Sequence, residues 1–151
     1  MRAWEEAARP FPLLSPPFLP QEVWDTLLLA CDFSIVRGED SWSRAALSGR
    51  PFLWQAYPQE GRQQLVKVRA FLDRMAPHFA TQGEAFSRIE SLFLAFNDRD
   101  RDGAVIGGEE ELLPALEAYS GLLLGFEAFS SSLSANPGLA PGLVTFLREI
   151  V

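Results

Sequence analysis

DFSIVRGEDSWSRAALSGRPFLW, residues 32–54, is the stretch that decides the fold. It opens with an apolar, β-branched run at 33–36 that is typical of a buried strand, and residues 51–54 supply a second apolar run after a glycine. Between the two runs a short helix is expected to begin at Asp40 and Ser41, residue types that cap free backbone N–H groups. The stretch therefore predicts a strand, a short helix and a second strand, the local unit of an α/β protein.

The turn between the first strand and the helix has the features of an anion site. A helix N-terminus that follows a buried parallel strand directs its free N–H donors and its positive dipole end at one spot. Gly38 allows the backbone to pass close to a ligand, and Arg37 adds a planar guanidinium suited to phosphate oxygens. The turn indicates a diphosphate site, and the alternative is that Arg37 and Glu39 only form a surface ion pair.

Length and composition limit the possible functions. The 151 residues correspond to one domain, and a hydrophobic content of 48% is ample for a packed core. The net charge of −7 argues against a nucleic-acid partner. Cys31 is the single cysteine, which excludes an intrachain disulfide, and its apolar neighbours predict a small core residue. No apolar run reaches the length of about 20 residues that a membrane span needs, so we expect a cytoplasmic protein without a membrane partner.

The rest of the chain reads as one extended loop and several helices. Residues 15–20 form a proline-rich loop, residues 21–30 have helical spacing, and Tyr57–Gly61 follow the second strand at the edge where open α/β sheets bind ligands. Beyond Arg62 the apolar residues recur with helical period, which predicts helices over 65–75, 86–96, 116–126 and 141–151.

Three linked blocks carry a family resemblance. PFLPQ at 17–21, RGEDS at 37–41 and GRPFLWQAYPQE at 49–60, in this order and spacing, resemble the donor-binding half of the elongation factor P arginine rhamnosyltransferases. The resemblance implies an α/β fold, the C-terminal Rossmann-like half of a GT-B glycosyltransferase, truncated at its N-terminus and with a helical C-terminal part.

The resemblance also implies how the chain is organised. Residues 1–151 would be a single partial domain, with a nucleotide-sugar-binding core at 14–61 and a helical remainder at 62–151 that ends in a cross-over helix. The N-terminal half, which binds elongation factor P, would precede this sequence, and the present fragment alone is expected to be inactive.

Site roles follow from the same resemblance. The donor would be dTDP-rhamnose, transferred with inversion to an arginine of elongation factor P, with no cofactor and no metal required. Glu39 would be the catalytic residue that faces the rhamnose. The donor-binding residues would be a base-binding group and a diphosphate-binding group: Phe18, Gln21 and Trp24, then Arg37, Asp40, Ser41 and Tyr57.

A second motif competes with this reading. Asp98, Asp100, Asp102 and Glu109 match the spacing of the calcium loop of an EF-hand. Against calcium stand an isoleucine at the ninth position, the absence of a second loop, and a proline at 114 where the exit helix should be established. The alternative is a solvated loop whose charges neutralise each other.

Three function classes therefore remain open. The leading one is the donor-binding half of an inverting protein-arginine rhamnosyltransferase, the second is a calcium-binding helical module, and the third is a non-catalytic nucleotide-sugar-binding domain. A preference for dTDP over UDP and GDP would favour the first class, and a calcium-dependent change in fluorescence would favour the second.

Overall fold

The computed structural model describes residues 15–98, 109–135 and 138 of the chain. These residues form a mixed α/β structure that is mostly helical, as expected in outline. Its elements, in chain order, are α1 (Gln21–Ala30), β1 (Ser34–Arg37), α2 (Glu39–Ser48), β2 (Phe52–Gln55), the 3₁₀ helix η2 (Glu60–Arg62), α3 (Gln63–Met75), the 3₁₀ helix η3 (Ala76–Phe79), α4 (Gly83–Asn97), α5 (Glu109–Glu117) and α6 (Tyr119–Ser134).

The predicted strand, helix and strand are confirmed. Within the described residues β1 and β2 form a two-stranded parallel sheet in which Ser34 pairs with Phe52 and Arg37 with Gln55. Gly49 ends α2 in the left-handed conformation, with φ 71°, which a glycine adopts without steric cost. The helix therefore returns the chain to the start of β2, and both strands end at the same edge.

The predicted helix cap is wrong. The N-cap of α2 is Gly38, and Asp40 and Ser41 already lie inside the first turn. In the described part of the chain no side chain caps this helix, so its first N–H groups have no partner within the helix. The physical reason is Gly38 itself, whose φ of 83° and ψ of 163° turn the chain sharply at the end of β1.

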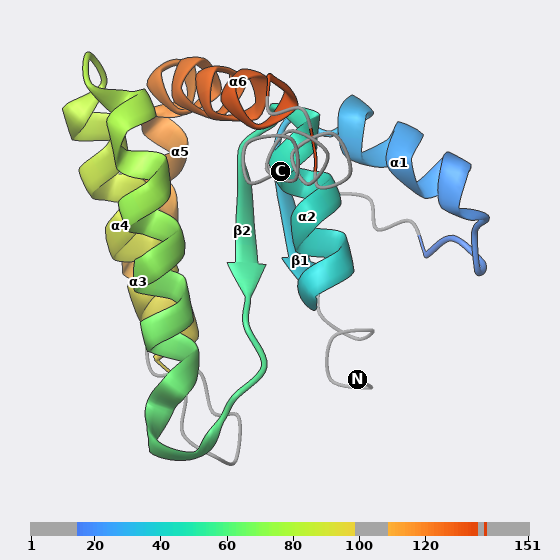
Figure 1. Ribbon diagram of the computed structural model, residues 1–151, viewed down its shortest axis with the longest axis horizontal. Coiled ribbons are helices and arrows are strands. Elements are labelled where there is room, and N and C mark those ends of the chain that lie inside the picture. Colours follow the sequence, from blue (N-terminus) through green and yellow to red (C-terminus); the bar gives the residue numbers. More distant parts are fainter. Residues whose placement is uncertain (1–14, 99–108, 136–137, 139–151) are drawn as a thin grey trace, which may run out of the picture.

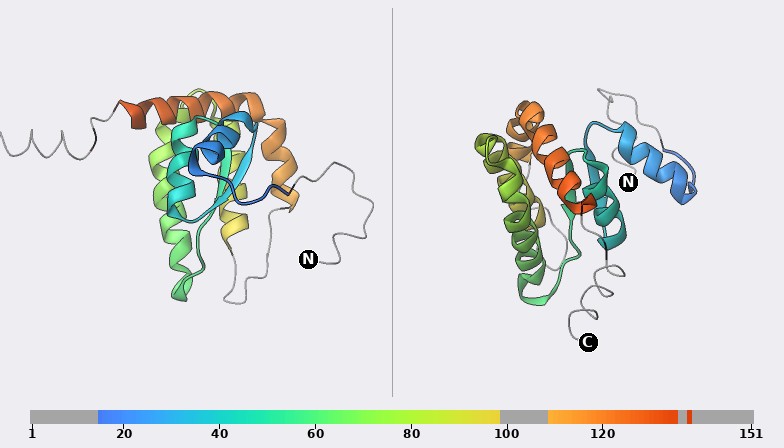
Figure 2. Two further views of the ribbon diagram at one scale, coloured as in Figure 1. Left: turned by 90° about the vertical axis from the view of Figure 1, so that its right-hand side faces the viewer. Right: turned by 45° about the horizontal axis from the view of Figure 1, so that its top comes forward.

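The sheet lies between two groups of helices, with α3 and α4 on one side and α2 on the other (Figure 1). α1 packs on the outer side of α2, and α6 runs across one end of the whole arrangement (Figure 2). Ser130 on α6 donates a hydrogen bond of 2.8 Å to the Leu47 carbonyl at the end of α2. Because α2 runs back from the carboxyl end of β1, α6 covers the end where the strands begin and leaves the opposite edge uncovered.

Aromatic side chains fill the core around β2. Phe52 has no exposed surface, and its ring lies 5.2 Å from that of Phe126, 5.9 Å from Phe71 and 6.2 Å from Phe93. These rings come from α6, α3 and α4, so a single strand residue joins three helices. Aromatic pairs at such distances add to the stability that their buried area provides.

The predicted helices over 65–75 and 86–96 are confirmed as α3 and α4. The helix predicted over 116–126 is wrong as one unit, because the chain breaks at Ala118 between α5 and α6. α5 also runs through Pro114, so the proline does not prevent a helix there. The fourth predicted helix lies outside the described residues.

Two further observations concern the surface. Cys31 is exposed, so its prediction as a core residue is wrong: α1 ends just before it and turns most of its surface away from the core. Among the described residues no single helix is long and apolar enough to span a membrane, and residues 110–117 pass that test of length and composition only together with α6, at a bend of 79°.

Candidate functional site

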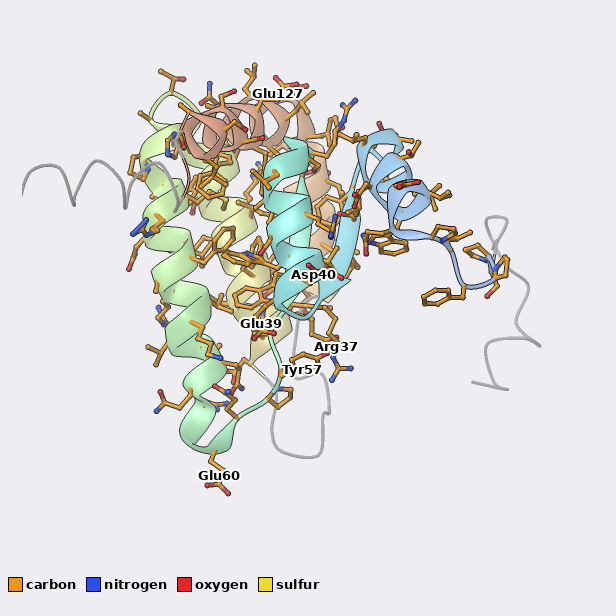
Figure 3. All side chains as sticks on the ribbon, turned by 45° about the vertical axis from the view of Figure 1, so that its right-hand side comes forward. Arg37, Glu39, Asp40, Tyr57, Glu60 and Glu127 are labelled. Atoms are coloured by element: carbon orange, nitrogen blue, oxygen red, sulfur yellow. The ribbon has the colours of Figure 1, made fainter. Side chains whose placement is uncertain are left out.

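Arg37 and Tyr57 lie side by side at the carboxyl edge of the sheet (Figure 3), and Gly38 lies against the same tyrosine. The guanidinium carbon of Arg37 lies 4.8 Å from the centre of the Tyr57 ring, a cation–π contact between the end of β1 and the loop after β2. A side chain at Gly38 would lie 3.4 Å from the Tyr57 hydroxyl. That distance is an ordinary van der Waals contact, so a glycine is favoured here for its backbone angles, with φ at 83°.

The Arg37 guanidinium is exposed and is not neutralised by its neighbour. No ion pair joins Arg37 to Glu39 in the described part of the chain, so the alternative of a local surface pair is wrong. The arginine therefore presents its charge to solvent beside the uncapped N-terminus of α2, and the two positive features lie at one spot.

The other two residues of the predicted diphosphate group lie on the first turn of α2. Ser41 is half-buried. The Asp40 side chain points outward and accepts a hydrogen bond of 3.1 Å from Arg44 Nε. That bond, with the charges of Asp25 and Asp40, raises the pKa of Arg44, although desolvation opposes the shift. Arg44 thus compensates the charge of one carboxylate on the first turn of α2.

The base-binding group is brought together around an open pocket. Phe18, Gln21 and Trp24 line a cavity of about 370 Å³ with Pro16, Pro17 and Leu19. The Phe18 ring is fully exposed and Trp24 is 38% exposed, so both rings present faces to solvent. The side-chain amide of Gln21 donates a hydrogen bond of 3.1 Å to Asp25, so this N–H group is already engaged and does not point to a base. Arg37 and Tyr57 do not line this cavity, so the two predicted groups lie apart.

Glu39 borders a second and larger cavity. Its volume is about 710 Å³, and it lies among α2, α3 and α6, with Trp42, Trp54 and Phe71 in its wall. The wall also carries two cations on α3, Lys67 and Arg74. The exposed Glu39 carboxylate thus stands between an apolar groove and the diphosphate turn.

One buried amide that the sequence did not single out holds the loop of Tyr57. Asn97 is 2% exposed; its Oδ1 accepts a hydrogen bond of 2.9 Å from the Ala56 N–H, and its Nδ2 donates one of 2.8 Å to the Trp54 carbonyl. Gln64 is 1% exposed, and its Oε1 accepts a bond of 3.0 Å from the Gln59 N–H. The sequence offered one signal for the role of Asn97: it is an amide at the end of an apolar helical face, and a buried amide needs hydrogen-bond partners.

The described residues provide no support for a calcium site. Asp98 forms an ion pair with Arg62, and no group of three or more metal-ligating side chains occurs in the part of the chain that the structure describes. Asp100 and Asp102 lie outside the described residues, and Glu109 is the first residue of α5. One argument against calcium is corrected, because α5 accommodates its proline.

Comparison with known proteins decides the family. The family model described as Elongation-Factor P (EF-P) rhamnosyltransferase EarP matches residues 9–148. The chain belongs to the EarP family. The resemblance based on the three sequence blocks is thereby confirmed.

Several EarP-family relatives are similar to this chain. A protein-arginine rhamnosyltransferase of Pseudomonas aeruginosa is 32% identical over 133 residues, which cover 88% of this chain and 33% of the relative. One from Shewanella oneidensis is 46% identical over 81 residues, 51% of this chain and 20% of the relative. A solved structure, described as the basis for EarP-mediated arginine glycosylation of translation elongation factor EF-P, has a TM-score of 0.67 and 31% identity and matches 89% of this chain and 40% of its own.

The matches cover only part of each relative. The chain spans about a third of the length of the Pseudomonas relative and 40% of the solved chain. The matches show the family and the local fold over the part of these relatives that they cover.

Proposed function

We propose that this chain binds dTDP-rhamnose, as the C-terminal Rossmann-like half of a GT-B enzyme that transfers rhamnose with inversion to an arginine of elongation factor P in the cytoplasm. The observation that carries the proposal is the turn from β1 into α2, where Arg37 lies over Tyr57 beside an uncapped helix N-terminus. Family membership supports the same reading.

The diphosphate fits this turn on electrostatic grounds. Free N–H groups at a helix N-terminus and a guanidinium fork both favour phosphate oxygens. The diphosphate gains charge as the glycosidic bond breaks, so donors held in place at this point lower the energy of the transition state more than that of the ground state. The cationic groups of the turn take up this charge, and we expect no metal to be required.

The two ends of the donor are assigned to the neighbouring features. Thymine would stack on Phe18 or Trp24, whose exposed faces line one open cavity. The sugar would face Glu39, whose carboxylate orients a hydroxyl or stabilises positive charge at the anomeric carbon. Gln21 already bonds to Asp25. To recognise the base, its amide would have to exchange that hydrogen bond for one to the base.

The transfer step needs a base that we do not assign to this chain. A guanidinium nitrogen of the acceptor bonds to the anomeric carbon on the face opposite the diphosphate, and the bond to the diphosphate oxygen breaks as dTDP leaves with its electron pair. The acceptor arginine is protonated in water, so a carboxylate must take one proton as the new bond forms. In the proposal that carboxylate, and the surface that holds elongation factor P, come from a separate half.

Titration of the chain with dTDP, UDP and GDP tests the donor assignment. We expect a preference for dTDP, quenching of Trp24 emission, and a loss of about tenfold or more in affinity for Arg37→Ala, since hydrogen bonds to charged groups contribute about 1.5–3 kcal/mol. Glu39→Gln should change the dTDP affinity less than about twofold, because its partner is the sugar. Arg69→Ala is the matched control: Arg69 is an exposed arginine of α3. Equal losses for Arg37→Ala and Glu39→Gln would contradict this division of roles.

A further inference from the structure

Four polar side chains form a continuous chain of hydrogen bonds between α1 and α2. Gln21 Nε2 donates to Asp25 Oδ1 at 3.1 Å. Arg44 Nη1 donates to both Asp25 oxygens, at 3.1 and 2.9 Å, and Arg44 Nε donates to Asp40 Oδ2 at 3.1 Å. One arginine thus connects a residue beside the predicted base pocket with a residue of the diphosphate turn.

α1 has little apolar packing to hold it in place. Leu28 is its one buried residue, while Val23, Trp24 and Leu29 are 44%, 38% and 53% exposed. Its remaining ties to the rest of the described chain include Arg44 and a hydrogen bond of 3.2 Å from Arg50 Nε to the Leu29 carbonyl. The contacts of Arg44 and Arg50 are therefore among those that fix the position of this helix.

The guanidinium geometry suits this task. Arg44 uses separate nitrogens for its two partners, with Nη1 toward Asp25 and Nε toward Asp40, which a lysine ammonium on a flexible stem does not reproduce. The contact with Asp40 also compensates the charge of a carboxylate on the first turn of α2.

We propose that Arg44 is a positioning residue of the donor site: by bridging Asp25 on α1 and Asp40 on α2, it sets the base-binding segment, residues 18–24, at a fixed distance from the diphosphate turn. This inference rests on the proposed function, because it assumes that one nucleotide contacts both groups. Arg44 itself does not touch the ligand. The base-binding segment and the diphosphate turn line no common cavity. Arg44 acts by holding them at a separation that one bound nucleotide can span.

The first test measures α1 in the free protein. Hydrogen exchange followed by mass spectrometry should show faster exchange of the α1 amides in Arg44→Gln, with α4 unchanged. Arg69→Gln, which removes a charge from the exposed face of α3, should leave both helices as they were. Unchanged α1 exchange in Arg44→Gln would overturn the proposal.

The second test measures dTDP binding by calorimetry on the same variants. Arg44→Gln should raise the Kd about threefold to fivefold, the scale of an exposed ion pair, and Arg44→Lys should fall between it and the unmutated chain. Asp25→Asn should also weaken binding, and the double variant Asp25→Asn/Arg44→Gln should bind no worse than Arg44→Gln alone, because both changes break one connection.

The outcomes separate the two proposals. If Arg44→Gln binds dTDP as tightly as the unmutated chain, the role of Arg44 is refuted and the donor assignment stands. Additive losses for Asp25→Asn and Arg44→Gln would likewise refute a shared connection. If the unmutated chain binds no dTDP, the donor assignment fails, and the role of Arg44 in it fails as well.

Discussion

Replacing Asn97 by alanine should destabilise the fold more than any exposed substitution. The amide supplies the acceptor for the Ala56 N–H and a donor for the Trp54 carbonyl, and it is 2% exposed. In Asn97→Ala both backbone groups lose these partners in a buried position, and each such loss costs about 1–3 kcal/mol. We therefore expect the free energy of unfolding to fall by about 2–6 kcal/mol, against a total of about 5–15 kcal/mol for an ordinary domain.

Urea unfolding followed by tryptophan emission measures this loss. Trp54 is buried and carries the affected carbonyl, so its emission reports directly on the loss. Ser91→Ala is the matched control on the same helix, since Ser91 is exposed and its hydroxyl donates to the Ser87 carbonyl within α4, and it should change stability by less than about 0.5 kcal/mol. A loss below about 1 kcal/mol in Asn97→Ala, with an unchanged urea dependence, would show that the amide does not hold the loop after β2.

Three further outcomes are expected. Gly125→Ala should cost about 1–3 kcal/mol of stability, because the new methyl group would overlap the Phe79 ring, whereas Gly83→Ala, with nothing within 4 Å, should be close to neutral; equal stabilities in thermal unfolding would contradict the packing of α6 on η3. Calorimetry should show no saturable binding of calcium at micromolar concentration, since Asp98 is paired with an arginine. A saturable calcium transition that Glu109→Gln abolishes would instead favour the calcium-binding module. The chain alone should transfer no rhamnose to elongation factor P, and mass spectrometry of the acceptor should detect transfer only after a separately expressed N-terminal half of a relative is added.

The βαβ unit was predictable because its signals are local. The β-branched run before Arg37, the second run after Gly49 and the helical period from residue 62 each depend on a few neighbouring residues. The helix cap was not predictable in detail, because Asp40 and Ser41 have cap chemistry but Gly38 has the backbone freedom that the turn required. The break at Ala118 was missed because apolar residues keep a helical period on both sides of it.

The site was predicted in part for a similar reason. The closeness of Arg37 and Tyr57 follows from parallel strands, whose carboxyl ends meet at one edge. The contact of Arg44 with Asp25 and those of Asn97 with Trp54 and Ala56 join residues 19 to 43 positions apart in the chain, and no spacing rule in a single sequence pairs such residues. Cys31 illustrates the limit from the other direction, because an apolar stretch predicted burial for a residue that the fold leaves exposed.

Polar contacts are added to apolar packing toward the carboxyl edge of the sheet, and this difference between its two ends bears on how donor binding would respond to mutation. Where the strands begin, aromatic rings of α3, α4 and α6 surround Phe52, so apolar burial dominates. Toward the carboxyl edge polar contacts are added to the aromatic packing of Trp54: Asn97 holds the backbone next to Tyr57, and Arg44 contacts α1. Exposed ion pairs contribute little to global stability, so substitutions at Arg44 should alter the affinity for a nucleotide while the melting temperature barely changes. Substitutions at Phe52 should do the reverse, lowering stability steeply while leaving the affinity of the molecules that remain folded unchanged.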